Sequence, residues 1–331
     1  MTGKLNSGKT GWAVGLVFLA FFVIYPFVVD AEKSYLVYFL YTTFIYVALA
    51  QGWNLAGGYT GQVSLGQHAF FGIGCYTTAI LWRVKAIGYF SPMGMILSGA
   101  GATILAIMVG LLLLSKLRGD YFALGTLGLG EILHVVAING GSLTQGPMGI
   151  NLPSDAYISM TYYYFIALAI AVLTLIVVLV MTRSSIGLAM VAIRENEVAA
   201  AANGVAVLKY KVIAFSAGAF VTGLCGSLDA YYTFHVDSAG AFNLDWVIIP
   251  ILMTILGGTG TILGPILGAF ILSGIFELAN MAMPQLHPIF SAAFIVLVTL
   301  FLPDGLMKYI TGHKEGVLRR LPLFRAIVRG T

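Results

Sequence analysis

Residues 183–211 decide how this chain folds, and they read RSSIGLAMVAIRENEVAAAANGVAVLKYK. The six charged residues of this polar island are Arg183, Arg194, Glu195, Glu197, Lys209 and Lys211. Long, nearly uncharged apolar runs flank the island on both sides. A charged segment between runs of membrane-spanning length must lie in water on one side of a membrane, where a partner can reach it. The RENE core and the alanine run that follows it therefore predict a helix that docks onto a partner protein.

The composition places the whole chain in a membrane. Of its 331 residues, 59% are hydrophobic and only 9% are charged, and the mean hydropathy is +0.95. Soluble domains carry about 25% charged residues, so this chain cannot cover a soluble surface. The 40 glycines indicate close helix packing and interrupted helices. The net charge of +4 does not indicate nucleic-acid binding, because the basic residues lie mostly in loops expected to face the cytoplasm.

Hydropathy predicts an all-α polytopic membrane protein with about ten transmembrane helices, eight or nine being the alternatives. The segment 246–256 is too short to span alone, so it must recruit residues 239–245 or be re-entrant. The predicted spans are residues 12–29, 35–55, 63–82, 93–114, 121–138, 162–181, 212–234, 246–256, 262–283 and 288–302.

Lysines and arginines in short loops predict the orientation. Residues 1–11 and the basic tail 303–331 are expected in the cytoplasm, together with the island, while residues 12–302 form the transmembrane domain. Three basic residues fall on the opposite side and do not fit, namely Lys33, Arg83 and Lys85. A cleaved signal peptide is the alternative for the first span, but no clear A-x-A site follows it.

No set of residues suited to catalysis is present in the sequence. Cys75 and Cys225 lie in apolar runs without a ligand partner at metal-binding spacing, which predicts reduced packing residues. The start, GKLNSGKT, matches a phosphate-binding loop pattern, but it lacks the preceding strand and leads into a membrane span. We therefore predict that the chain is not an enzyme, with no catalytic, metal or cofactor site of its own.

Two glycine-rich breaks interrupt the apolar runs. The first break, residues 57–68, reads GGYTGQVSLGQH, and the second break, residues 257–265, reads GGTGTILGP. Irregular backbone at membrane depth persists only when it is buried in protein or lines a wet cavity. The pair indicates either a central transport pathway between two related halves or tight helix crossings, and both readings remain open.

Few ionisable residues lie inside the predicted spans. Glu131 lies mid-span with His134 one turn later on the same helix face. Because a mid-membrane charge costs roughly 2.5–3.5 kcal/mol, Glu131 needs a hydrogen bond between helices or a hydrated route. Asp229 and Glu277 allow the same two readings, closer to span ends. The candidate pathway residues are Gln62, Ser64, Gln67, His68, Glu131 and Thr259.

Five motifs together resemble one family, and they occur in its order along most of the chain. They are residues 58–71 (GYTGQVSLGQHAFF), 118–131 (RGDYFALGTLGLGE), 143–150 (LTQGPMGI), 183–204 with the IRENE core, and 256–269 (LGGTGTILGPILGA). The chain resembles the permease subunit of a branched-chain amino acid ABC importer, of the LivM subfamily. The family commonly has glycine where Gln145 stands.

The resemblance implies partners and a location. It implies a heterodimer with a paralogous permease in lipid, two cytoplasmic ATPases that use ATP, an external solute-binding protein, and the bacterial inner membrane. The family motif E-x-A-A-x-x-x-G falls on the alanine run of the island, and Gly204 would end the helix with a left-handed residue. The expected ATPase-coupling residues are Arg194, Glu195, Asn196, Glu197, Ala199, Ala200 and Gly204.

The sequence also allows other functions. The island could be a solvated surface helix, and the chain a self-sufficient secondary transporter or channel that acts without an ATPase. Urea and amide importers share these motifs. The binding protein largely sets the substrate, so leucine, isoleucine and valine are the default expectation.

Overall fold

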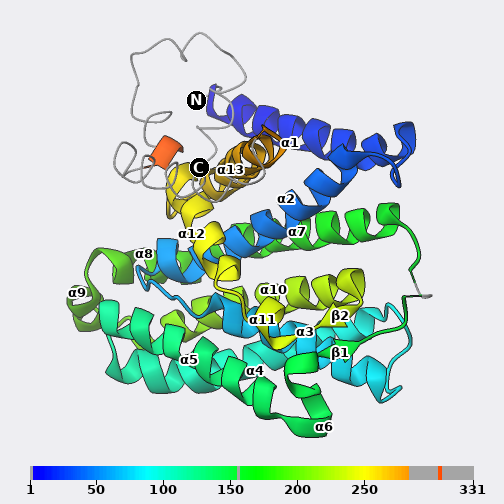
Figure 1. Ribbon diagram of the computed structural model, residues 1–331. Coiled ribbons are helices and arrows are strands. Elements are labelled where there is room, and N and C mark those ends of the chain that lie inside the picture. Colours follow the sequence, from blue (N-terminus) through cyan, green and yellow to red (C-terminus); the bar gives the residue numbers. More distant parts are fainter. Residues whose placement is uncertain (1–2, 155–156, 283–304, 308–331) are drawn as a thin grey trace.

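The computed structural model describes residues 3–154, 157–282 and 305–307, and their regular structure is almost wholly helical (Figure 1). The two-residue strands β1 (Ile150–Asn151) and β2 (His235–Val236) pair in antiparallel register, Ile150 with Val236 and Asn151 with His235. The helices are α1 (Gly3–Val28), α2 (Tyr35–Asn54), α3 (Gln67–Arg83), α4 (Pro92–Lys116), α5 (Asp120–Asn139), α6 (Gly141–Thr144), α7 (Met160–Arg183), α8 (Ser185–Glu195), α9 (Glu197–Ala202), α10 (Val207–Thr233), α11 (Ser238–Ala241), α12 (Asp245–Gly257) and α13 (Leu263–Ala282).

Seven helical stretches in the described residues are long and apolar enough to cross a membrane, which confirms an all-α polytopic membrane protein. They belong to α2, α4, α5, α7, α10, the α11–α12 pair and α13. The predicted count of about ten is not reached by these seven: α1 contributes a shorter apolar stretch, Val17–Val28, and the last predicted span, 288–302, lies outside the described residues. The predicted span 246–256 does include preceding residues, as one of the two alternatives required. α11 precedes it, and together with α12 it forms the stretch Ser238–Gly257.

The third predicted span begins later than its hydropathy indicated. α3 starts at Gln67 rather than at residue 63 and has 17 residues, about 25 Å of helix against roughly 30 Å of hydrocarbon. The preceding chain is held away from helical geometry by Gly61, with φ +70°, and by a hydrogen bond from Trp53 Nε1 to the Ser64 carbonyl. The first break therefore shortens the helix that follows it.

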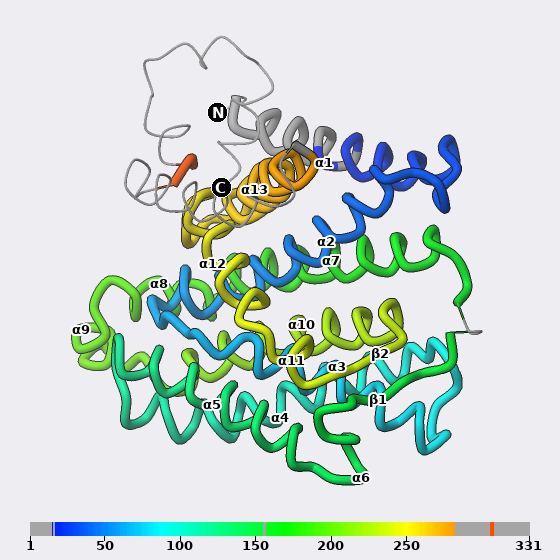
Figure 2. The backbone as a smooth tube through the Cα atoms, in the orientation of Figure 1, coloured from blue at the N-terminus to red at the C-terminus, as the bar shows by residue number. Residues whose placement is uncertain are grey.

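α10 is the central helix of the stack. It packs against α4 and α3 on one side and against α2 on the other, and α2 in turn contacts α7, α12 and α13. Figure 2 shows the same order, with α4 and α5 below α10, and α2, α13 and α1 above it. Because α2 and α10 are largely buried, both present nearly continuous apolar surface, as a helix enclosed on all sides must.

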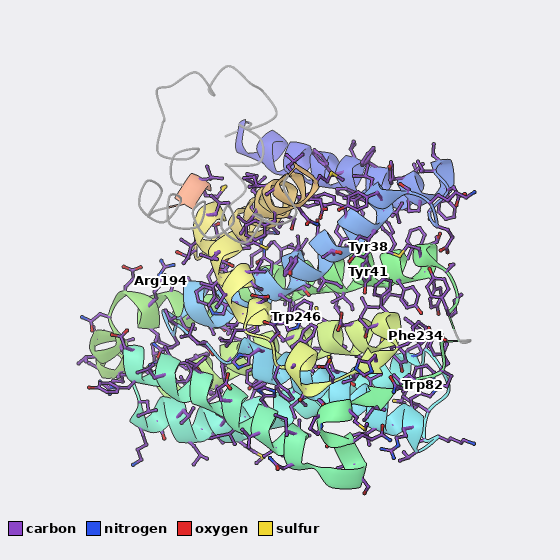
Figure 3. All side chains as sticks on the ribbon, viewed as in Figure 1. Tyr38, Tyr41, Trp82, Arg194, Phe234 and Trp246 are labelled. Atoms are coloured by element: carbon purple, nitrogen blue, oxygen red, sulfur yellow. The ribbon has the colours of Figure 1, made fainter. Side chains whose placement is uncertain are left out.

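One end of the stack carries β1, β2 and a cluster of aromatic rings, and the opposite end carries α8 and α9 (Figures 1 and 3). Trp82 and Phe234 lie in the aromatic cluster with Tyr89, whose ring stacks on Phe234 at 5.8 Å. Rings of this kind fill the space between the ends of α3 and α10. The two ends of the stack are thus chemically different.

Two of the basic residues that did not fit the predicted orientation have local partners. Lys33 pairs with Asp30 at 3.0 Å in the α1–α2 turn, and the hydrogen bond from Lys33 lowers the pKa of that carboxyl. Arg83 donates to the carbonyl oxygens of Ser142, at 2.7 Å, and Leu143. The orientation rule counts Lys and Arg whatever their partners, so these contacts explain how the two side chains are held and leave the misfit in place.

Candidate coupling segment and transport site

The polar island folds into two short helices and not into the single docking helix expected from the sequence. α8 ends at Glu195 and α9 begins at Glu197, with Asn196 extended between them at φ −160°. The Asn196 side chain accepts a hydrogen bond from the Ala199 N–H at 3.0 Å. Asparagine at this place caps a new helix because its oxygen satisfies an N–H that has no partner in the first turn. We refer to residues 184–204 as the α8–α9 segment.

The far end of the segment agrees with the sequence expectation. Gly204 follows α9 with φ +84°, the left-handed geometry predicted for it, and its N–H donates to the Ala201 carbonyl at 3.0 Å. Its Cα faces open space on the side where a Cβ would stand. Glycine is required here by backbone conformation and not by crowding.

Glu197 is committed to contacts within the chain. Its carboxylate lies 2.6 Å from Lys211 Nζ and 3.8 Å from Arg118 Nε. The Lys211 side chain is only 1% exposed, so this ammonium depends on Glu197 for its charge partner. Ala200, one turn later, is also buried. Two expected coupling residues are therefore turned into the chain, and Glu197 ties α9 to α10 and to the α4–α5 connection.

Arg194 also points back into the helix stack. Its Nη1 donates to the Gly58 carbonyl at 3.1 Å, while Nε and Nη2 bond to Glu195 Oε1 at 3.2 and 2.9 Å. Figure 3 places Arg194 at the end of the stack opposite Trp82 and Phe234. The guanidinium thus joins α8 to the first break.

The α8–α9 segment exposes large aliphatic side chains beside its charged residues. Leu188 and Val198 are both largely exposed, Val198 at 70%, and Ala199 lies beside Val198 on the surface. Large exposed aliphatic side chains outside the membrane-spanning helices mark a contact surface. Leu188 and Val198 were not among the expected coupling residues, although aliphatic residues among charges on two short helices are the signal that could have found them.

The two glycine-rich breaks lie against one another. α2 continues past Asn54 as one π-helical turn, Leu55–Tyr59, so residues 57–59 of the first break are helical. Asn54 accepts a hydrogen bond from the Gly260 N–H at 2.8 Å and donates to the Thr261 carbonyl at 2.9 Å. Gln51 donates to the Ile262 carbonyl. These amides, missed in the sequence because they sit inside an apolar run, satisfy backbone groups that lack helical partners.

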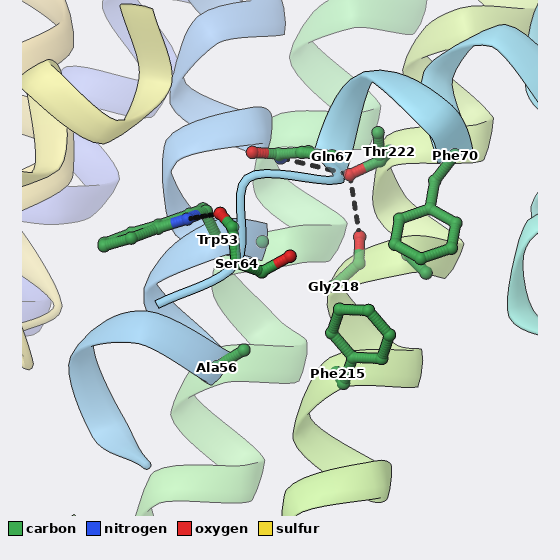
Figure 4. A pocket seen from close by; sticks show the side chains of 10 residues that line it. Trp53, Ala56, Ser64, Gln67, Phe70, Phe215, Gly218 and Thr222 are labelled. Atoms are coloured by element: carbon green, nitrogen blue, oxygen red, sulfur yellow. Dashed lines mark hydrogen bonds between the residues drawn. The ribbon is translucent and has the colours of Figure 1, made fainter. Parts of the chain in front are cut away.

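A small cavity lies between α2, α3 and α10. Its volume of about 20 Å³ holds about one water molecule. Beside it, the Gln67 side-chain N–H group donates to the Leu49 carbonyl at 2.8 Å and to Thr222 Oγ1 at 3.1 Å (Figure 4). The side-chain oxygen of Gln67, Oε1, is buried without a hydrogen bond to the described residues. Ser64 is a second polar lining residue. The cavity is too small for an amino acid.

The remaining candidate pathway residues are dispersed. His68 is fully buried with its ring against Gly130, while Gln62 is half-buried and Thr259 is exposed at the second break. Glu131 Oε2 lies 3.9 Å from His134 Nδ1, as the helical spacing predicted, but the Glu131 side chain is 54% exposed on α5. The structure therefore brings Ser64 and Gln67 to one cavity and leaves Glu131 on an outer face.

A helical membrane stack with paired helix breaks and a separate short-helix segment has the architecture of a membrane transport permease. Residues 35–301 match the model of the branched-chain amino acid transport system permease component, and the chain belongs to this family.

Curated relatives agree with this assignment. The chain is 29% identical over 299 residues to the high-affinity branched-chain amino acid transport system permease protein LivM of Escherichia coli, across 80% of this chain and 68% of that protein. It is 28% identical over 299 residues to the protein of the same name from Salmonella typhimurium, with the same coverage. A probable branched-chain amino acid transport permease protein LivM of Methanocaldococcus jannaschii is 27% identical over 215 residues, across 60% of this chain and 62% of that protein. No solved structure matches the chain.

Proposed function

We propose that this chain is the permease subunit of an ATP-driven importer that moves branched-chain amino acids, or related amino acids and amides, into the cytoplasm. In this proposal the chain works with a paralogous permease, two cytoplasmic ATPases that bind and hydrolyse the ATP, and an extracytoplasmic solute-binding protein. It lies in the bacterial inner membrane with both termini and the α8–α9 segment in the cytoplasm. Family membership supports the amino acid cargo.

The observation that carries the proposal is the construction of the α8–α9 segment. Its inner side is anchored by the Glu197–Lys211 ion pair and by Arg194, while its outer side presents Leu188 and Val198. A solvated surface helix needs neither the buried ion pair nor the exposed aliphatic side chains. A segment that is anchored to the helix stack on one side and exposes large aliphatic side chains on the other is suited to receive force from a partner, here the ATPase.

The exposed face of α5 supports a second permease. Glu131 and His134 lie on that face in the middle of a span long enough to cross the membrane. Facing lipid, such a carboxylate would cost roughly 2.5–3.5 kcal/mol on insertion scales. Protein, or a hydrated route shared with a paralogous subunit, would remove that cost.

The test is uptake of labelled leucine, isoleucine and valine by right-side-out membrane vesicles that contain the complete transporter. We expect accumulation that needs both internal ATP and the binding protein and that persists when ionophores collapse the ion gradients. An ATPase subunit unable to hydrolyse ATP should abolish it. Uptake that follows an ion gradient without ATP would instead show a secondary transporter. Competition by urea or short amides, but not by leucine, would show that the transporter is a urea or amide importer of the same family.

Docking through the apolar side of α9 yields a separate prediction. Val198→Asp should weaken ATPase recovery with the permease by about tenfold or more, because a valine buried in a contact contributes about 1.5 kcal/mol or more. Co-purification at graded salt measures it. The matched control is Val84→Asp, which changes a valine 62% exposed after α3, near the aromatic end. Equal ATPase recovery for the two variants would place the docking surface elsewhere.

A further inference from the structure

The place where the two glycine-rich breaks meet is occupied by one side chain from the α8–α9 segment. Arg194 Nη1 is hydrogen-bonded to Gly58 of the first break at 3.1 Å. The same nitrogen packs against Gly260 of the second break so closely that a Cβ on Gly260 would overlap it. The Arg194 Cγ lies 3.2 Å from the Cβ position of Gly61. The arginine thus touches both breaks at once.

The two breaks are also bonded to each other at this point. The Asn54 side chain accepts a hydrogen bond from the Gly260 N–H and donates one to the Thr261 carbonyl. The end of α2 and the α12–α13 connection are therefore linked by hydrogen bonds. Gly58 is at the end of the π-helical turn, where carbonyl groups have no partner within the helix. A cationic donor satisfies such a carbonyl and suits the negative end of a helix.

The guanidinium geometry explains why arginine stands here. Nε and Nη2 are both bonded to Glu195, which holds the group in a fixed plane and leaves Nη1 for the Gly58 carbonyl. The planar fork of arginine makes both contacts in one fixed geometry, whereas the ammonium of lysine is a point charge on a flexible stem and does not hold that geometry. Arg194 also lies two residues before Asn196, the point where α8 gives way to α9.

We propose that Arg194 is a positioning residue that carries displacement of the α8–α9 segment to both glycine-rich breaks together. The proposal rests on the proposed function, in which an ATPase moves that segment. When the segment shifts, the guanidinium pulls the Gly58 carbonyl through its hydrogen bond and pushes against Gly260. Because Asn54 bonds the two breaks to each other, they move together. α2 and the α12–α13 pair then change position relative to α10. Without Arg194, ATP would be hydrolysed while the breaks stayed in place.

The first experiment compares Arg194→Gln and Arg194→Lys with Lys209→Gln in the reconstituted transporter. Lys209 is a matched control, because it is an exposed cation of the same island that lies over the ring of its own neighbour Tyr210, at 5.9 Å. Both Arg194 variants should assemble normally and keep hydrolysis stimulated by the binding protein, while leucine uptake falls about tenfold or more, the order expected on losing a hydrogen bond to a charged group. Lys209→Gln should keep both activities. Uptake near wild type in the Arg194 variants overturns the proposal, and so does a parallel loss of assembly, hydrolysis and uptake, which marks a purely structural residue.

The second experiment needs no ATPase. A cysteine at Thr259, exposed in the second break, reports local opening through its rate of labelling by a thiol reagent, and the native Cys75 and Cys225 are buried. In the full chain in detergent, Arg194→Gln should raise the labelling rate several-fold and Lys209→Gln should not. An unchanged rate in Arg194→Gln overturns the link between α8 and the second break. If wild type shows no ATP-driven uptake, the proposed function fails, whereas this labelling result still decides whether the link exists.

Discussion

Reversing the charge of Glu197 is expected to detach α9 from the rest of the chain. In Glu197→Lys, the buried ammonium of Lys211 loses its only observed anionic contact among the described residues and meets a second cation, with Arg118 close by. Removing one partner of a buried ion pair costs about 3–5 kcal/mol, because the other charge remains buried without compensation. Since Glu197 itself is partly exposed, we expect the lower end of that range. Thermal unfolding in detergent should show a clearly lowered midpoint, and ATPase recovery should fall with it.

The matched test is the exchanged pair. Glu197→Lys combined with Lys211→Glu restores opposite charges at the same two positions, so the double variant should regain much of the stability lost by the single one. Lys209→Glu controls for charge reversal on the exposed side of the island and should leave the unfolding midpoint near wild type. If the double variant regains stability without regaining ATPase recovery, Glu197 also contacts the ATPase. A single variant as stable as wild type would contradict the internal role of the ion pair.

Hydropathy could predict where most helices lie, because membrane spans are defined by length and apolarity alone. Residues 121–138 were expected as a span and α5 runs from Asp120 to Asn139, and the expected span 162–181 corresponds to α7. The period of the helix likewise placed His134 beside Glu131. Properties of this kind depend on residues close together in the sequence, so they can be predicted from the sequence alone.

The direction in which a charged side chain points could not be predicted in the same way. Lys211 belongs to the polar island by composition, yet it is buried because Glu197, fourteen residues earlier, folds back over the start of α10. Arg194 was expected among the residues that contact the ATPase, yet it bonds to Gly58, far away in sequence. Such contacts are set by which helices pack together, and neither periodicity nor charge counting contains that information.

The role of the glycine-rich breaks could not be predicted, because it depends on a contact between them that is not visible in the sequence. Their mutual similarity is weak, and only the hydrogen bonds of Asn54 to Gly260 and Thr261 show that they meet. The two hypotheses, a transport pathway and tight helix packing, concern the same place, because the irregular backbone of both breaks lies within the packed junction. The chain between the π-helical turn and α3 also passes the cavity beside Gln67. Movement at this junction is therefore the step to which transport should be most sensitive.

Adding a single methyl group at Gly218 should disrupt the centre of the stack. A Cβ on Gly218 would overlap the carbonyl oxygen of Gly52 in α2 and stand 3.1 Å from its carbonyl carbon. Backbone atoms cannot rotate away as side chains can, so α2 must move off α10, and we expect a loss of stability near the upper end of the 1–3 kcal/mol usual for overpacking. Because α2 carries Gln51 and Asn54, the same displacement should loosen the junction of the two breaks and lower leucine uptake by more than tenfold.

Gly101 of α4 is the matched control for this substitution. A Cβ there would lie 3.6 Å from Thr77 Oγ1 and 3.7 Å from the Ile73 methyl carbon, which are ordinary contacts. Alanine favours a helix over glycine by up to about 1 kcal/mol at either position, so the difference between Gly101→Ala and Gly218→Ala isolates the crowding. Yield of monodisperse protein in detergent and its unfolding midpoint measure that difference. If Gly218→Ala matched Gly101→Ala in both, α2 and α10 could separate without loss, and their contact would not be the rigid frame on which the two breaks depend.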